Sequence, residues 1–376
     1  MLATTICVAS LAVASVYGAR QASTDSTISY TVGAPVMTRP LTVHYIYYGS
    51  WSAAQKSIVE DFTNGVGKSG WWGVQKNYYS QASATAAKVP VSGSVRLGST
   101  IVDNYTFGKA LSGTNVPDLI QQYVASGALP NSADAVYVVL TASDVTESMR
   151  TDALSASFCR DYCGYHLTTT LSSGTRVPYI MAGIPTGTCL GGCAPLPNVA
   201  NSPNGDVGVD AMVSTLAGQM AGVVTNPQSD GTRAWQDISG FEGNDLCSFS
   251  FGSTIPTANG AASNVGWNKR RFLIQQNWDP SKQTCTMGTP DAPIPSPIPS
   301  TTTSIIPSPM TSTAISTVTS TKRPVITSAI STLSRTTRTT STRTSSRKGQ
   351  RTPTPVPRGP SCDPKDFCCI YLGHSC

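Results

Sequence analysis

The sequence predicts an α/β (or α+β) fold in which a mixed sheet packs against helices and disulfides cross-link the chain. Residues 41–48 and 135–140 form apolar runs whose β-branched and aromatic content is typical of buried strands. These runs alternate along the chain with helical patterns, as expected for a layered architecture. The cysteines also fall into blocks of even number, which indicates disulfides formed in an oxidising compartment.

The first predicted strand and helix follow one another directly. Residues 41–48 read LTVHYIYY and end at Gly49, where the chain can turn. A helix is predicted over residues 52–66, because Ser52 is a favoured N-cap and the apolar residues that follow recur on one face. This pair of elements is expected to pack together in the core.

The segment that follows is predicted to contain more of the core. The aromatic pairs at 71–72 and 78–79 are expected to be buried. Residues 92–102 alternate in polarity like one arm of a hairpin. A short helix is predicted over residues 117–125, ahead of the central strand at 135–140.

The second half is predicted to hold one more strand and a long helix. Residues 177–181 read as a strand that ends before Gly183. The helix covers residues 211–224, with Asp206 or Asp210 as its cap, and stops at the Asn-Pro pair 226–227. Because this helix has no charged residue and is apolar on all sides, it is expected to be buried.

Residues 1–18 predict a signal peptide, so the mature chain is expected to be secreted. The apolar run 2–13 is shorter than the roughly 20 residues that span a bilayer, and small residues follow it. No Lys or Arg precedes this run, which leaves a buried N-terminal strand as the alternative. The sequon at Asn104 predicts N-glycosylation in the same compartment.

The ten cysteines left after removal of Cys7 predict disulfides within two separate blocks. Six lie in the body and four in the tail: Cys159, Cys163, Cys189, Cys193, Cys247 and Cys285, then Cys362, Cys368, Cys369 and Cys376. The two Cys-x3-Cys pairs of the body leave a four-thiolate zinc site as an alternative. Structural zinc sites usually use a tighter Cys-x2-Cys spacing, so disulfides are favoured.

Composition divides the mature chain into four further parts. An N-terminal segment covers residues 19–34, a globular domain 35–287, a Ser/Thr/Pro-rich stalk 288–360 and a cysteine-rich tail 361–376. The stalk has too few apolar residues to offset the entropy of ordering, so it is expected to be disordered, either as an O-glycosylated spacer or as a plain linker. The tail is too small to fold without disulfides, and it serves as a contact patch or as an end-cap.

The basic character of the chain belongs to the stalk. The whole sequence carries a formal charge of +6, whereas residues 289–360 hold nine Lys or Arg against Asp291 alone. Net charge of this kind favours weak, salt-sensitive contact with acidic polymers, or serves only to keep the stalk extended. No nucleic-acid partner is expected, and no segment after the signal peptide is apolar enough to be expected to cross a membrane.

Candidate catalytic residues are few. Of the three histidines, only His166 lies among other polar residues, since His44 falls in a strand pattern and His374 in the tail. The domain has no Gly-x-Ser-x-Gly elbow, no His-Glu pair and no Gly-rich phosphate loop. A glycosidase needs two opposed carboxylates, and spacing does not select a pair from the seven candidates: Asp144, Glu147, Asp206, Asp210, Asp237, Glu242 and Asp245.

Seven blocks of the globular domain occur in a recognisable order. They are residues 41–49 with 55–62, 71–72 with 78–79, 136–144, 158–166, 203–210, 225–227 and 278–280. In this order they resemble the EXORDIUM or phosphate-induced protein family of secreted proteins from plants and other walled cells. The resemblance covers essentially the whole globular domain and neither the stalk nor the tail.

The resemblance implies a metallopeptidase (zincin)-like scaffold whose metal site is degenerate here. Some relatives carry Ala-His-Glu-Ile-Ala-Glu in the helix before the Asn-Pro stop, followed by a Glu-x-x-Asp-x-Cys element. The equivalent helix positions in this chain are Gly218, Gln219 and Gly222, while Glu242 and Asp245 remain in the later element. Glycine offers no ligand atom, and an amide is not a base at neutral pH. The resemblance therefore implies no metal, no cofactor and no catalytic residue.

The predicted function is that of a non-catalytic protein of the cell wall or extracellular matrix. Family resemblance implies a role linked to growth and cell expansion, with a wall polysaccharide or an extracellular protein as partner. The alternative is a metal-dependent hydrolase of the zincin type, or a carbohydrate-active enzyme that uses His166 and nearby carboxylates.

Overall fold

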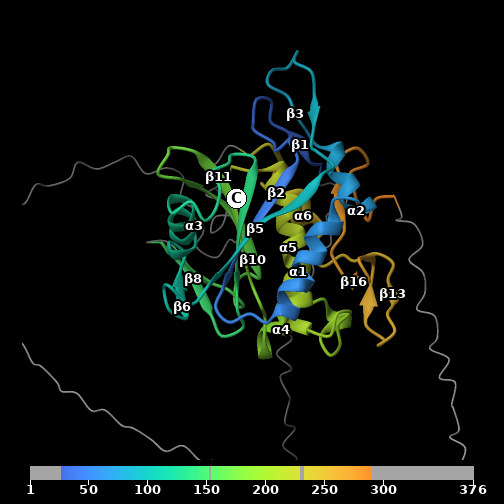
Figure 1. Ribbon diagram of the computed structural model, residues 1–376. Coiled ribbons are helices and arrows are strands. Elements are labelled where there is room, and N and C mark those ends of the chain that lie inside the picture. Colours follow the sequence, from blue (N-terminus) through green and yellow to red (C-terminus); the bar gives the residue numbers. More distant parts are fainter. Residues whose placement is uncertain (1–26, 152–153, 229–232, 290–376) are drawn as a thin grey trace, which may run out of the picture. The chain divides into compact units, whose positions relative to one another are not determined.

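The computed structural model describes residues 27–151, 154–228 and 233–289 (Figure 1). At its centre lies a five-stranded mixed sheet whose spatial order is β5 (Val95–Asp103), β2 (Leu41–Tyr48), β7 (Ala135–Thr141), β11 (Arg176–Gly183) and β10 (Gly164–Thr170). Its neighbouring strands run parallel except for β10, which pairs antiparallel with β11 at one edge. The mixed sheet with packed helices confirms the predicted fold class. The predicted signal peptide, the tail and all but the first two residues of the predicted stalk lie outside the described residues.

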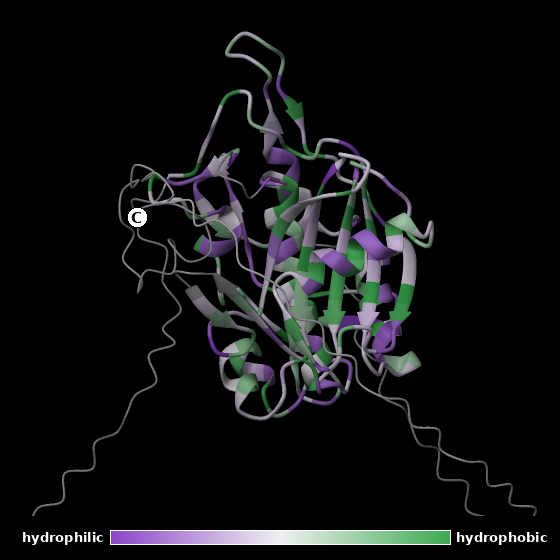
Figure 2. Cartoon of the chain, turned by 90° about the vertical axis from the view of Figure 1, so that its left-hand side faces the viewer, coloured by the Kyte–Doolittle hydropathy of each residue, from purple (hydrophilic) through white to green (hydrophobic). Residues whose placement is uncertain are grey.

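The two central strands β2 and β7 are buried on both faces, which explains why they read as continuous apolar runs. Successive side chains of a strand point to opposite faces of a sheet. Val43, Tyr45 and Tyr47 of β2 therefore enter one core, whereas Ile46 and Tyr48 enter the other. Figure 2 shows the hydrophobic residues concentrated along the central strands.

Helices cover both faces of this sheet and complete three layers. The helices α1 (Ala53–Val66) and α5 (Val207–Thr225) pack on one face, and α3 (Asn115–Ala125) packs on the other (Figure 1). As predicted, Ser52 caps α1: its side chain accepts a hydrogen bond from the backbone N–H of Gln55, and the Gln55 side chain accepts one from the backbone of Ser52.

The helix α5 runs through the core. The side chain of Asp206 accepts a hydrogen bond from the backbone N–H of Val209 and so caps the helix, while Asp210 accepts one from the backbone of Asn204. The helix ends at Thr225, and the side chain of its C-cap residue Asn226 donates to the carbonyl of Trp235. By length and composition α5 is apolar enough to cross a membrane, but 78% of that window is buried inside the domain. It is a core helix of this fold, as predicted.

The remaining elements are short and connect or flank the central layers. They are β1 (Ser29–Tyr30), α2 (Gly70–Gly73), η1 (Val74–Asn77), β3 (Tyr79–Ser80), β4 (Val89–Pro90), β6 (Ala110–Ser112), β8 (Thr146–Thr151), β9 (Leu154–Ser157), η2 (Gly187–Cys189), α4 (Leu190–Cys193), η3 (Leu196–Asn198), β12 (Trp235–Gln236), α6 (Gly243–Leu246), β13 (Ile255–Pro256), β14 (Ala262–Ser263), β15 (Val265–Trp267), β16 (Arg270–Phe272), β17 (Asn277–Asp279) and β18 (Thr284–Thr286). The pair β1–β12 joins the N-terminal segment to the domain.

The segment 92–102 forms a strand, but the prediction of a hairpin arm is wrong. Its strand β5 lies parallel to β2 at the sheet edge, with an irregular register around His44. There Nδ1 of His44 accepts a hydrogen bond from the backbone N–H of Ser99 at 2.8 Å, and the ring lies against Gly98. His44 therefore supports the irregular register. Alternating polarity marks a half-exposed strand at any sheet edge, so it does not distinguish parallel from antiparallel pairing.

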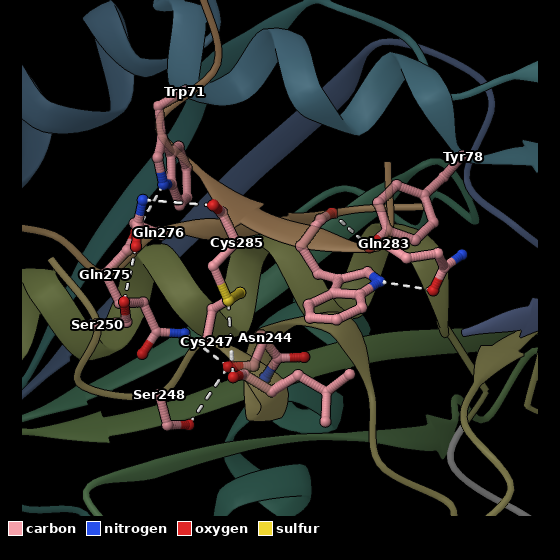
Figure 3. The surroundings of a disulfide bond; sticks show 12 residues. Trp71, Tyr78, Asn244, Cys247, Ser248, Ser250, Gln275, Gln276, Gln283 and Cys285 are labelled. Atoms are coloured by element: carbon pink, nitrogen blue, oxygen red, sulfur yellow. Dashed lines mark hydrogen bonds between the residues drawn. A yellow bond between two sulfur atoms is a disulfide. The ribbon is translucent and has the colours of Figure 1, made fainter. Parts of the chain in front are cut away.

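Three disulfides cross-link the domain, which confirms that the six body cysteines pair among themselves. They join Cys159 to Cys189, Cys163 to Cys193 and Cys247 to Cys285. The two Cys-x3-Cys pairs are thus held as disulfides rather than as four thiolates. Figure 3 shows the third disulfide beside Trp71, whose indole N–H donates to the carbonyl of Gln275 at 2.7 Å. This contact ties the segment after α1 to the C-terminal part of the domain.

Candidate functional site

The fold brings together His166, Gln219 and Glu242, three residues that the sequence analysis singled out. His166 comes from the edge strand β10, Gln219 from α5, and Glu242 is the N-cap of α6. The Nδ1 atom of His166 lies 2.9 Å from Oε1 of Gln219, and its Nε2 atom lies 3.4 Å from Oε2 of Glu242. The imidazole thus faces an acceptor on each side.

A second cation, Arg233, completes this cluster, and the sequence analysis did not identify it. Its Nη1 atom lies 3.5 Å from Oε1 of Glu242 and also donates to the carbonyl of Gly240 at 2.9 Å. The side chains of Arg233 and Glu242 are only 2% and 4% exposed. We call His166, Gln219, Arg233 and Glu242 the buried polar cluster. No spacing in the sequence marks Arg233, because its partner is set by the tertiary fold.

Electrostatics favour the charged forms of both His166 and Glu242. Burial acts to lower the pKa of His166, but the Glu242 carboxylate and the hydrogen bond to Gln219 outweigh it, so this pKa lies above its usual value. Burial acts to raise the pKa of Glu242, but His166 and Arg233 hold it below its usual value. The cluster is therefore a buried ion network in which a carboxylate sits between two cations.

Gly222 is the position where the helix and the buried polar cluster meet. A Cβ atom added there would lie 2.7 Å from Cε1 of His166, 2.9 Å from Oδ1 of Asn244 and 3.0 Å from Oε2 of Glu242. One turn earlier, a Cβ on Gly218 would lie 2.9 Å from Nε2 of Gln275. The space that a ligand side chain would need at these two positions is therefore already filled by neighbouring side chains.

We expect Gly222→Ala to destabilise the protein by about 1–3 kcal/mol, because the added methyl group overpacks the cluster. Gly73→Ala is the matched control, since Gly73 is also helical and a Cβ there would meet nothing within 4 Å. That control should be neutral or slightly stabilising. Urea denaturation of both variants measures the difference, and equal behaviour would contradict the crowding at Gly222.

Asp245 serves the backbone rather than the cluster. Its Oδ2 atom accepts a hydrogen bond from the backbone N–H of Glu242 at 2.9 Å, which caps the short helix α6. Burial, together with the nearby Glu242 carboxylate, raises the pKa of Asp245 to about 6. These two effects on the charged form therefore outweigh the position of Asp245 in the first turn of α6, where a helix N-terminus favours a negative charge.

The donor set of the cluster does not fit a zinc ion. Across residues 27–151, 154–228 and 233–289, no group of three or more His, Cys, Asp or Glu side chains is arranged to hold a metal. Zinc sites in proteins use three or four nitrogen, sulfur or oxygen ligands. The cluster offers one imidazole and one carboxylate, and these already contact each other.

The other candidate carboxylates each have local partners. Asp144 forms an exposed ion pair with Lys109 at 2.6 Å, and Asp237 accepts hydrogen bonds from the backbone of its own turn, residues 239–241. Asp206 and Asp210 serve the start of α5. These contacts give the carboxylates structural partners and do not single out an opposed pair.

Glu147 lies in a buried group of tyrosines that the sequence analysis did not foresee. Its carboxylate accepts hydrogen bonds from the hydroxyls of Tyr162 and, at 3.3 Å, Tyr165. Glu147 is only 2% exposed, and burial raises its pKa to about 7 although the two hydroxyls oppose this shift. Burial and the Glu147 charge also keep the pKa of Tyr165 well above its usual value.

The raised pKa of Glu147 predicts that this residue contributes less to stability as the pH rises from about 4.5 to about 7. In that window the unfolded chain has lost the Glu147 proton while the folded chain still holds it, so folding becomes less favourable by about 3 kcal/mol. Glu147→Gln keeps an acceptor and removes the titration. Thermal unfolding across this window should therefore show a flatter pH dependence for the variant, and parallel curves would contradict the raised pKa.

A cavity of about 230 Å³ opens elsewhere in the domain, and none of the predicted site residues lines it. Its wall includes Met37, Thr168 and Pro178, and its rim carries the exposed ion pair between Arg39 and Asp134 at 3.0 Å. The predicted site residues therefore do not form the wall of this opening.

Asn104 of the predicted sequon is exposed and directly follows β5. The next residue, Tyr105, has a positive φ of 59°, so the chain turns here. An exposed turn of this kind is compatible with attachment of a glycan. The glycosylation itself stays a prediction.

Comparison with known proteins identifies relatives of the domain. The model of the phosphate-induced protein 1 conserved region matches residues 28–288. The chain is 33% identical to protein EXORDIUM-like 3 of Arabidopsis thaliana, over 69% of this chain and 82% of that protein. It is 28% identical to protein PHOSPHATE-INDUCED 1 of Nicotiana tabacum, over 65% and 83% of the two chains. No solved structure matches the chain. The chain belongs to the phosphate-induced protein 1 family, which includes the EXORDIUM proteins.

Proposed function

We propose that this protein is secreted to the cell wall or extracellular matrix, where it binds a wall polysaccharide or an extracellular protein without catalysing a reaction. Family membership and three disulfides support an extracellular location, since disulfides persist in oxidising compartments. By this proposal it serves in growth and cell expansion.

The observation that carries the proposal is the state of the buried polar cluster. Its histidine and carboxylate are paired with each other, with Gln219 and with Arg233. The adjacent helix positions are glycines, against which neighbouring side chains pack closely. A catalytic centre needs a group able to bind or deprotonate water or substrate. Here the polar groups that would do so are buried and lie within ion-pair or hydrogen-bond distance of one another.

A zincin-like scaffold is the architecture that we infer for this cluster. In support, α5 carries positions 218, 219 and 222, and the edge strand β10 places His166 against the same helix. By this inference, α5 corresponds to a helix that carries metal ligands in other proteins of this scaffold, and here it only packs in the core. The crowding at Gly222 also predicts that restoring ligand side chains there requires a shift of His166 and Glu242.

Metal analysis combined with activity assays separates the binding proposal from the enzyme alternative. Purified full-length chain should contain less than stoichiometric zinc and should not hydrolyse peptide or glycan substrates in a chelator-sensitive manner. One equivalent of zinc, together with an activity that is lost in His166→Ala, would overturn the proposal. Asp144→Ala serves as the control, because Asp144 is exposed and paired with Lys109.

The basic stalk supplies the second part of the proposal, namely contact with acidic polymers. Its nine basic residues between 289 and 360 favour salt-sensitive association. Full-length protein should bind pectin at low salt and elute as salt rises, whereas deletion of residues 289–360 should abolish most of this retention. Unchanged retention after deletion would show that the stalk is not the anchor.

A further inference from the structure

Two of the disulfides form a single cluster of four sulfur atoms. Cys159 and Cys163 lie in the connection between β9 and β10, whereas Cys189 and Cys193 lie in the consecutive short helices η2 and α4. Both disulfides therefore join the same two segments, and each spans 30 residues of sequence. The third disulfide, between Cys247 and Cys285, joins different segments.

The inner halves of these two disulfides lie beside each other. The Sγ atoms of Cys189 and Cys193 belong to different disulfides, yet they are only 3.9 Å apart. Cys189 and Cys193 are buried, with 5% and 4% of their surface exposed. Their partners Cys159 and Cys163 are partly exposed. A thiolate released at Cys189 would thus face a disulfide sulfur rather than solvent.

We propose that these four cysteines form a thiol–disulfide exchange centre with two alternative pairings. Exchange proceeds when a thiolate attacks a disulfide sulfur and expels the other sulfur as a new thiolate. The incoming reactant is an external thiol, either a small thiol or the cysteine of another protein. The external thiol reacts at the partly exposed side of the cluster, at Cys159. The thiolate released on the buried side, at Cys189, then attacks the neighbouring disulfide.

Each step of the exchange conserves atoms and electrons. An external thiolate attacks Sγ of Cys159, forms a mixed disulfide with it and releases the Cys189 thiolate. That thiolate attacks Sγ of Cys193, which forms a Cys189–Cys193 disulfide and releases the Cys163 thiolate. The Cys163 thiolate then attacks Cys159 and regenerates the external thiolate. The external thiol is a catalyst, and no net oxidation or reduction occurs.

The two pairings differ in what they hold together. In the observed pairing, the two disulfides tie the β9–β10 connection to the consecutive short helices η2 and α4. In the exchanged pairing, each disulfide closes within its own Cys-x3-Cys segment and no covalent bond joins the two. The connection leads directly into β10, the strand that carries His166. Exchange therefore releases a covalent tie at the edge of the central sheet.

The variant Cys159→Ser tests this centre, because it leaves Cys189 without its partner beside the Cys163–Cys193 disulfide. Exchange in the full-length variant would be stopped with acid, the free thiols would be alkylated, and the alkylated cysteines would be located by peptide mass spectrometry. We expect the free thiol to be shared between Cys189 and Cys163, since the exchange step interconverts them. A thiol found on Cys189 alone would overturn the proposal.

The matched control is Cys285→Ser, which removes the disulfide partner of Cys247. The third disulfide joins other segments than the first two, so exchange is not expected there. The free thiol of this variant should stay on Cys247. The unaltered full-length chain gives a second measurement that does not depend on a variant's folding. With a catalytic amount of reduced glutathione at neutral pH, a Cys189–Cys193 disulfide should accumulate while Cys247–Cys285 persists. If the glutathione-treated chain shows only the original pairings or free thiols, the exchange centre is refuted.

Discussion

Glu242→Ala is expected to lower the free energy of unfolding by about 3–5 kcal/mol, because removal of one partner from a buried ion network leaves the others uncompensated. In this protein, loss of the Glu242 carboxylate leaves the cations Arg233 and His166 without their anionic partner. Their side chains are 2% and 8% exposed. Urea denaturation near pH 6 measures this loss while His166 is charged. Glu242→Gln, which keeps the shape and an acceptor, should lose less.

The pair between Arg39 and Asp134 supplies a matched control at the surface. Its atoms lie closer, at 3.0 Å, but its side chains are 74% and 48% exposed. Exposed pairs contribute only about 0–1 kcal/mol, so Asp134→Ala should change stability little. If Glu242→Ala and Asp134→Ala have equal effects, the buried polar cluster is not an ion network.

Removal of the disulfide between Cys247 and Cys285 is expected to destabilise the protein by about 4 kcal/mol. It closes a loop of 38 residues, and a loop of this length gives that value in the chain-entropy treatment. Cys247 is also fully buried, and the surrounding contacts join Trp71 and Tyr78 to the C-terminal segment (Figure 3). The double variant Cys247→Ala with Cys285→Ala, compared by urea denaturation, measures the loss.

The double variant Cys159→Ala with Cys189→Ala is its control. Here the neighbouring disulfide Cys163–Cys193 still closes nearly the same loop, so much less freedom is returned to the unfolded chain. We therefore expect a clearly smaller loss than for Cys247 and Cys285. A loss as large as theirs would mean that the two disulfides do not act as one constraint.

The elements buried on all sides were the ones that the sequence predicted best. The strands β2 and β7 and the helix α5 read as uninterrupted apolar runs, because both faces of the sheet and all sides of the helix are covered. The pairing of β5 was predicted wrongly, because partner choice depends on residues distant in the chain. The helix α1 was found through its cap at Ser52, which is a local signal.

The candidate site was predicted in part, from family resemblance and from the polar residues around one histidine. Family resemblance identified four positions, namely Gly218, Gln219, Gly222 and Glu242. The polar residues around it in the sequence identified His166. The fold places Gln219 and Glu242 against His166. Arg233 and the tyrosines around Glu147 carry no sequence signal, since their charge partners come from other elements. Crowding at glycine positions is likewise invisible until neighbouring side chains are placed.

The ring nitrogens of His166 test the central claim most directly, namely that the polar groups of the cluster are paired with one another. The chain has only three histidines, so a long-range ¹H–¹⁵N spectrum resolves them, and His166→Gln assigns the signal. The pairing with Gln219 and Glu242 predicts that both ring nitrogens of His166 stay protonated to a higher pH than those of an ordinary histidine, because the Glu242 carboxylate and the hydrogen bond to Gln219 raise its pKa. A pH titration in which the ring loses its proton at or below the usual pH for histidine, leaving one bare nitrogen free to bind a metal, would contradict the account.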